Sequence, residues 1–130
     1  MSKLRFILYF AALVFAVSAG LSCGSSQGQG QLQSITLNPA TADATEVQFT
    51  ATGHYVNPSH TVTPQPVAWT ACYQGSPTTD VLVAPGGLVE CSSKAAGAYT
   101  IYGFDQTSCN VITECGGGCT IVGTAQLTCP

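Results

Sequence analysis

Seven cysteines account for most of the chemistry that this sequence offers. Cysteines form disulfides in oxidising compartments, and clustered thiolates bind zinc. Because the count is odd, one cysteine of an exported protein has to stand outside the disulfides. We expect that residue to be Cys23, which lies far from the others, and we expect the rest to pair. The six disulfide candidates are Cys72, Cys91, Cys109, Cys115, Cys119 and Cys129.

The pairing of these six cysteines is open, since many connectivities are possible. The spacing Cys109-x5-Cys115-x3-Cys119 also leaves a zinc site as an alternative, although no histidine lies nearby. Glycines at positions 116–118 would let the chain reverse tightly between Cys115 and Cys119. Our working hypothesis is the set Cys72–Cys91, Cys109–Cys129 and Cys115–Cys119.

The N-terminal residues have the pattern of a secretion signal. Lys3 and Arg5 precede an uninterrupted apolar run over residues 6–17, which is too short for a comfortable membrane span. Small residues follow, and then Cys23. We therefore interpret residues 1–22 as a signal peptide.

A cysteine directly after a small residue at this point resembles the lipobox of bacterial lipoproteins. The resemblance implies a lipid on Cys23 and a membrane anchor in the cell envelope. Cleavage by ordinary signal peptidase after Ala19, which would give a freely secreted protein, is the alternative. Residues 23–31 are polar and uncharged, and we interpret them as a flexible tether.

The charge of the exported part argues against nucleic acid as a partner. Lys94 is the single basic residue after Arg5, whereas the chain has six acidic residues. Phosphate binding requires clustered Lys and Arg side chains, and no such cluster exists here.

Residues 32–130 predict one all-β domain. Apolar side chains alternate with polar ones around Val47 and Phe49, and again around Trp69, which is typical of half-buried strands. We expect seven strands, with a bulge near Gln33, at residues 34–37, 47–55, 67–73, 80–83, 88–92, 98–104 and 120–129. Short, evenly spaced strands favour an antiparallel β-sandwich.

The alternation also predicts which side chains form the core and which do not. The expected core residues are Val47, Phe49, Trp69, Ile101 and Leu127. Cys72 has the opposite parity to Trp69, so its disulfide is expected on the surface.

The order of the segments resembles the bacterial immunoglobulin-like domains of the BIG type. The segments that carry the resemblance are LQSITLNPA, EVQFTATGHY, VAWTAC, DVLVAPGGLVEC, AAGAYTIYGF and GTAQLTC, spread over residues 32–129. The resemblance implies an immunoglobulin-like sandwich with Trp69 as its core tryptophan.

No catalytic motif occurs in the sequence, and we expect no enzyme activity, cofactor or metal. His54 and His60 flank a loop and are expected to be exposed. The favoured function is a lipid-anchored structural or protein-interaction module of the envelope, which meets its partner through residues 56–66 and 105–118. A carbohydrate- or cell-wall-binding domain is the alternative, and an exposed aromatic pair would favour it.

Overall fold

The computed structural model describes residues 29–111 and 115–130. The predicted signal peptide, the lipidation candidate Cys23 and most of the predicted tether lie outside these residues. The first strand begins at Gln31, one residue before the predicted start of the domain at residue 32.

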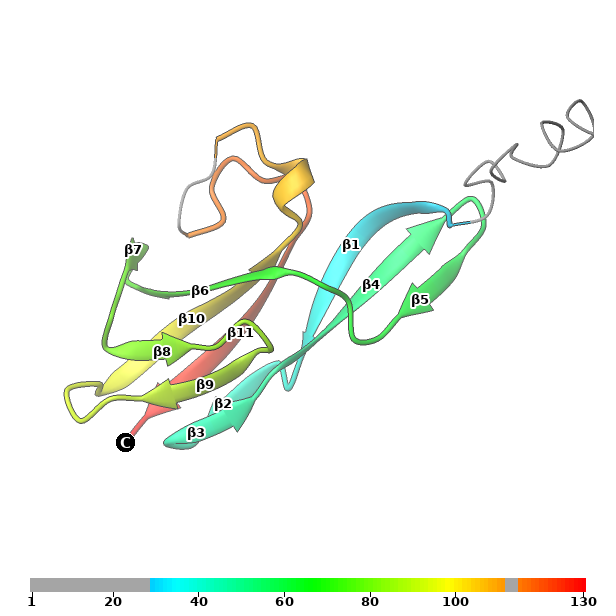
Figure 1. Cartoon of the computed structure of the whole chain (residues 1–130). Helices are drawn as coiled ribbons and strands as arrows, with labels where there is room; N and C mark the ends of the chain where they lie inside the picture. The colour runs from blue at the N-terminus through cyan, green and yellow to red at the C-terminus, as the bar shows by residue number, and fades with distance from the viewer. Residues whose placement is uncertain (1–28, 112–114) are drawn as a thin grey trace, which may run out of the picture.

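The described residues form eleven β-strands and one short 3-10 turn, η1, at Gln106–Ser108 (Figure 1). None of their helical segments is long and apolar enough to span a bilayer. The prediction of an all-β fold is confirmed. The strands are β1 Gln31–Asn38, β2 Thr41–Asp43, β3 Glu46–Gln48, β4 Thr50–Val56, β5 His60–Val62, β6 Ala68–Tyr73, β7 Ser76–Pro77, β8 Val81–Val83, β9 Leu88–Cys91, β10 Gly97–Phe104 and β11 Val122–Cys129.

The strands form three hydrogen-bonded sheets in a sandwich-like arrangement. Their orders are β1-β4-β5, β2-β11-β10-β6-β7 and β3-β9-β8. Every pairing is antiparallel except that of β2 with β11, which is parallel. The predicted bulge is confirmed, since the register of β1 shifts between Leu32 and Ser34.

The predicted strand over residues 47–55 is divided at Phe49. Before this residue β3 pairs with β9, and after it β4 pairs with β1 and β5. The Phe49 backbone N–H donates to Gly87 O at 2.9 Å and so continues the β3–β9 register by one residue, before the chain joins the other sheet at Thr50. The bend lets one continuous stretch serve two sheets, and it leaves the Phe49 side chain fully buried.

A pair of glycines brings β1 close to the five-stranded sheet. Gly103 of β10 and Gly123 of β11 are cross-strand partners. A Cβ at Gly103 would lie 2.9 Å from Leu37 Cδ2, and one at Gly123 would lie 2.8 Å from Ile35 O. Side chains at these positions would push β1 away, so the two glycines set the distance between the layers.

The core prediction is confirmed for Phe49, Ile101 and Leu127, which are fully buried. It is wrong in degree for Val47 and Trp69, which are partly buried and pack against the core. Val47 lies on the outermost strand of its sheet, where neighbours cover it on one side only. Trp69 lines an open groove, described below.

Three disulfides form, as predicted, but the predicted pairing is wrong in all three bonds. Cys91 of β9 bonds to Cys129 of β11 and joins the two layers. The other bonds are Cys72–Cys115 and Cys109–Cys119. The order of the strands along the sequence does not predict these bonds, because the sandwich brings segments that are distant in sequence close together.

The expected surface position of Cys72 is also wrong, since its exposed fraction is 1%. Cys115 and Gly116, from the segment between β10 and β11, lie over the outer face of the five-stranded sheet. A Cβ at Gly116 would lie 2.9 Å from the Tyr102 ring on that face, and Cys115 reaches Cys72 there. This loop buries a side chain whose parity would otherwise expose it.

Candidate binding groove

A hollow in the described surface lies beside Trp69, between the segment that follows β5 and the β8–β9 turn. Its volume is about 520 Å³, within the range typical of ligand sites. We refer to it as the Trp69 groove. Its lining residues are Gln48, Phe49, Thr50, Ala51, Pro64, Gln65, Pro66, Val67, Trp69, Pro85 and Gly86.

One wall of the groove is the segment that returns from β5 toward β6. Gln65 N donates to Ala51 O at 2.8 Å, which holds the segment beside β4. Tyr55 OH donates to Gln65 Oε1 at 2.9 Å, and the hydroxyls of Thr52 and Thr63 lie 2.7 Å apart in a second hydrogen bond. This wall is therefore positioned by hydrogen bonds.

The opposite wall is the β8–β9 turn, and Gln48 connects it to β3. Gln48 Nε2 donates to Phe49 O and to Gly86 O, each at 2.8 Å. The next residue, Gly87, has φ +88°, and a Cβ there would collide with Phe49 O and the Trp69 indole. Glycine is required at this position by both the backbone conformation and the close approach.

Trp69 forms the floor of the groove and contacts the backbone of two glycines. Hypothetical Cβ atoms at Gly87 and Gly103 would lie 2.9 Å and 3.4 Å from its Cζ2 and Cζ3 atoms. The indole is therefore fixed from the β8–β9 turn and from β10. Its residual exposure faces the groove that it lines.

A second hollow, of about 360 Å³, lies on the other side of Pro66 and Val67. Residues 104–107 line its far side, so the two hollows share one dividing segment. Both loops that the sequence suggested as contact regions, 56–66 and 105–118, thus contribute to neighbouring hollows.

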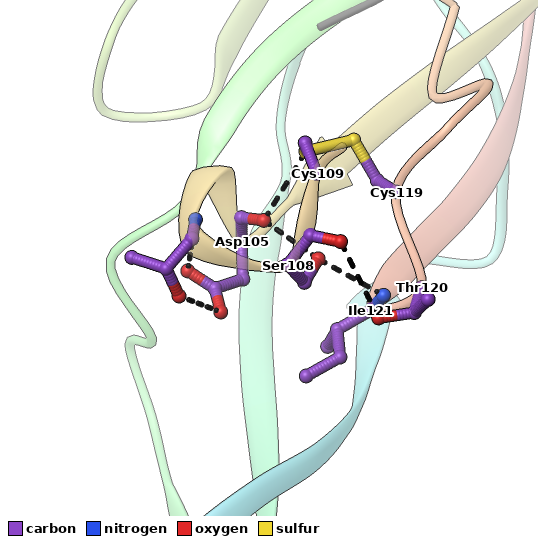
Figure 2. Close-up of a disulfide and its surroundings, with 7 residues drawn as sticks. Asp105, Ser108, Cys109, Cys119, Thr120 and Ile121 are labelled. Carbon is purple, nitrogen blue, oxygen red and sulfur yellow. Dashed lines mark hydrogen bonds between the residues drawn. A yellow bond between two sulfur atoms is a disulfide. The ribbon is translucent and has the colours of Figure 1, made fainter. Parts of the chain in front are cut away.

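A disulfide and several hydrogen bonds hold residues 105–111 beside residues 115–121, and we refer to these two stretches as the 105–121 loop (Figure 2). Cys109 and Cys119 are opposite each other in an isolated antiparallel bridge and are bonded through sulfur. Asn110 N donates to Gly118 O at 2.9 Å just beyond this bond. The stretches on either side of this bond therefore lie antiparallel and are covalently joined.

Asp105 and Ser108 fix the base of this loop. The Asp105 carboxylate accepts from Thr107 N at 3.2 Å and from Thr107 Oγ1 at 2.7 Å, and so caps η1. Ser108 Oγ donates to Asp105 O at 2.7 Å and accepts from Ile121 N at 3.1 Å. Figure 2 shows these contacts joining both ends of the loop.

The two histidines lie on the β4–β5 hairpin and do not come together at a site. His54 Nε2 is 3.0 Å from Thr36 Oγ1, whereas the His60 ring stacks on Tyr55 with 4.7 Å between centroids. No cluster of three or more His, Cys, Asp or Glu residues that could hold a metal ion occurs in the described ranges.

The exposure of the aromatic side chains bears on the carbohydrate hypothesis, which an exposed aromatic pair would favour. Tyr73 is 41% exposed and lies 5.2 Å, centroid to centroid, from Tyr99, but Tyr99 is buried. A pair exposed on both rings is therefore not formed here. Trp69 is the aromatic side chain best placed to meet a ligand, because it lines a hollow and is only partly buried.

The chemistry of the Trp69 groove is that of a binding surface. An indole and three proline rings supply apolar contact, and the carboxamides of Gln48 and Gln65 supply polar groups. Sequence reasoning did not identify this groove. The proline-rich stretch at 64–66 was the available signal, but proline marks loops without showing what they face.

In comparisons with known proteins, no protein-family model and no curated protein matches the chain.

Proposed function

We propose that this protein is an exported, non-enzymatic immunoglobulin-like module that binds a partner at the cell envelope. We propose further that a lipid on Cys23 anchors it to a membrane. The groove beside Trp69 is the observation that carries the binding role. It is open, it has ligand-site volume and it is walled by loops of the kind that carry recognition in β-sandwiches.

The strand order supports the immunoglobulin-like assignment. Central β10 lies between β6 and β11, and β9 lies between β3 and β8. In immunoglobulin folds the C, F and G strands form one sheet, and the B, E and D strands belong to the other. Trp69 on β6 then corresponds to the tryptophan of strand C.

The disulfides support export. Three disulfides in a domain of this size are typical of proteins that fold in an oxidising compartment. The odd cysteine, Cys23, is left for the lipid that the lipobox resemblance implies.

The intact mass of the protein from its native host tests the proposed localisation and lipid anchor. We expect a chain that starts at Cys23, carries a diacyl or triacyl adduct and gains six alkylated thiols only after reduction. Replacing Cys23→Ser should abolish the adduct and release the protein from the membrane fraction. A native chain that starts at Gly20 and carries no lipid would remove the anchor from the proposal.

Affinity enrichment from the envelope fraction tests the binding role. Pro66 is exposed and separates the two hollows, so Pro66→Asp places a charge between them. Pro130→Asp is the matched control at the exposed C-terminal residue. We expect a partner that the wild type and Pro130→Asp retain and that Pro66→Asp loses. Equal retention by all three proteins would exclude the Trp69 groove as the binding surface.

A carbohydrate or cell-wall polymer is the second candidate ligand, because the groove combines an indole with two carboxamides. Aromatic faces with amide hydrogen-bonding groups suit sugar rings. A glycan array and a pull-down on purified cell-wall polymer distinguish the candidates. If neither experiment detects binding, the carbohydrate candidate is excluded and a protein partner is favoured.

A further inference from the structure

The sheet β1-β4-β5 differs in charge from the rest of the described domain. Its three strands and the turn between β4 and β5 contain no Asp, Glu, Lys or Arg residue. The carboxylates of the described chain all lie elsewhere, at Asp43, Glu46, Asp80, Glu90 and Asp105. One of the three sheets is therefore uncharged apart from its histidines.

Four of these carboxylates gather at the end of the domain where β11 finishes. The contacts that place them there are Asp43–Thr128, Glu46–Glu90, Cys91–Cys129 and Asp80–Ser92. Lys94, the single basic residue in 29–111 and 115–130, follows β9 at the same end, which leaves a net charge of 1 − 4 = −3. Asp105 lies beside the start of β11, between the two ends.

The chain enters the domain at the uncharged end. Gln31 is the register partner of Val56, at the end of β4. A Cβ at Gly30 would lie 2.9 Å from Val56 O and 3.1 Å from His60 Cε1. Residues 57–61, which we call the hairpin tip, are exposed. Figure 1 shows the start of β1 at one end of the molecule and the C-terminus at the other.

The length of chain between Cys23 and the domain limits how an anchored domain can lie. Gly30 follows Cys23 by seven residues, and seven residues span at most about 25 Å. The Ile35–Gly123 contact is four residues from the first residue of β1 and six residues from the last residue of β11. Ten residues of strand span about 33 Å. An inverted domain, with its C-terminal end on the membrane, would need more chain than is present.

Charge favours contact through the hairpin tip over contact through the side of the domain. Anionic lipid headgroups repel carboxylates, and the repulsion acts within a Debye length of about 8–10 Å. A domain that lies on its side brings its carboxylates toward the headgroups, whereas the sheet that ends in the hairpin tip has none.

From these observations we propose that the hairpin tip rests on the lipid headgroups of the anchoring membrane, with the carboxylate-rich end turned away. This inference rests on the proposed lipid at Cys23, and it adds the orientation in which the module meets a partner. A Cβ at Gly103 would lie near both Leu37 and Trp69. Leu37 is six residues from the start of β1, so the Trp69 groove stands about 20 Å beyond the tip and stays open to a partner.

Acylation by diethyl pyrocarbonate tests this orientation on the lipidated protein. His60 Nδ1 lies 3.0 Å from Pro58 O. A carbonyl oxygen only accepts, so Nδ1 carries the proton and Nε2 keeps the lone pair that reacts. Lys94, exposed at the other end, reacts with the same reagent and is the internal reference.

The protein is reconstituted in vesicles of phosphatidylglycerol and phosphatidylethanolamine, and mass spectrometry measures both rates. The reference is the Cys23→Ser protein mixed with the same vesicles. We expect the lipid anchor to slow acylation of His60 by about fivefold or more, because keeping even one carboxylate off the surface favours the docked orientation by that factor. The rate at Lys94 should not change.

Two exposed serines provide a matched pair of charge variants. Ser59→Glu places a carboxylate in the hairpin tip, and Ser93→Glu places one in the loop after β9. Each rate is divided by that of the same variant without the lipid, which removes any direct effect of the carboxylate on the imidazole. Ser59→Glu should reduce the protection of His60 by about fivefold, whereas Ser93→Glu should leave it unchanged. On phosphatidylcholine vesicles, which have no net charge, Ser59→Glu and the wild type should be protected equally.

Three results would overturn the proposal: equal acylation of His60 with and without the anchor, equal protection of His60 and Lys94, or protection of His60 in the Cys23→Ser protein that rises with protein concentration. The last would identify a second copy at the hairpin tip. A native chain without lipid would remove the anchor and this inference together. A lipidated chain with an unprotected His60 would refute this inference alone and leave the proposed function standing.

Discussion

The two ends of this sandwich are held together by different means. The first region, which we call the cystine frame, comprises β6 to β11 and the 105–121 loop, and it contains the three disulfides seen among the described residues. The second, which we call the arm, comprises β1, β4, β5 and residues 63–67. In Figure 1 the arm extends to one side of the other strands.

No disulfide lies within the described residues of the arm, which is stabilised by side-chain hydrogen bonds and by close packing. Its parts are joined by the Tyr55–Gln65 and Thr52–Thr63 hydrogen bonds and by the close approach of β1 to Gly103 and Gly123. The cystine frame resists unfolding through covalent loops, whereas the arm opens when its packing or hydrogen bonds are lost. The Trp69 groove lies where the two regions meet, so its shape depends on both.

Removing the inter-layer disulfide should destabilise the protein more than removing the shorter-range Cys109–Cys119 disulfide. The Cys91→Ser, Cys129→Ser double variant opens a loop with a sequence separation of 38, for which loop-closure entropy gives about 4 kcal/mol. Urea unfolding with intrinsic fluorescence measures this loss. A loss below about 1 kcal/mol would show that the frame does not depend on the bond.

Removing the Cys109–Cys119 disulfide should have a smaller and local effect. Its sequence separation is 10, which corresponds to at most about 3 kcal/mol. We expect faster hydrogen exchange in residues 105–121 and unchanged exchange in the arm. Faster exchange across β1 and β4 would contradict the separation of the two regions.

Gly123→Ala tests the contact between arm and frame. The new Cβ meets backbone at Ile35 O, which cannot move as a side chain does, so we expect about 1–3 kcal/mol of destabilisation. Gly86→Ala is the matched control, because nothing lies within 4 Å of its Cβ position. Faster exchange in β1 for Gly123→Ala alone is the expected signature, and equal effects of both variants would refute it.

The cap of the 105–121 loop should contribute least. Asp105→Ala removes the acceptors for Thr107 N and Thr107 Oγ1, and losing such a cap costs about 1 kcal/mol. Asp105→Asn retains one acceptor and should recover part of this loss. Thermal unfolding of both variants, with the disulfides intact, provides the comparison.

The sequence predicted the parts of this structure that depend on local pattern. Alternation identified the seven main strands, the buried Phe49, Ile101 and Leu127, and the bulge of β1. The bend at Phe49 was not visible, because a strand that changes sheets retains its alternation. The short strands β2, β5 and β7 were missed, since two or three residues are too few to show an alternation of apolar and polar side chains.

The disulfide pairing and the groove depend on tertiary structure, and they could not be predicted locally. Cys72 is buried where it bonds to Cys115, and nothing in the parity of β6 indicates that contact. Trp69 was predicted as core on alternation, whereas the glycines at 87 and 103 decide how its ring lies. Such contacts join residues far apart in the chain.

Disulfide mapping of the unreduced, natively exported protein tests the central claim most directly. Digestion followed by mass spectrometry should recover the linked peptides Cys72–Cys115, Cys91–Cys129 and Cys109–Cys119, and no free thiol among these six cysteines. Recovery of Cys72 linked to Cys91, or of six free thiols, would contradict the covalent frame and the export that we infer from it.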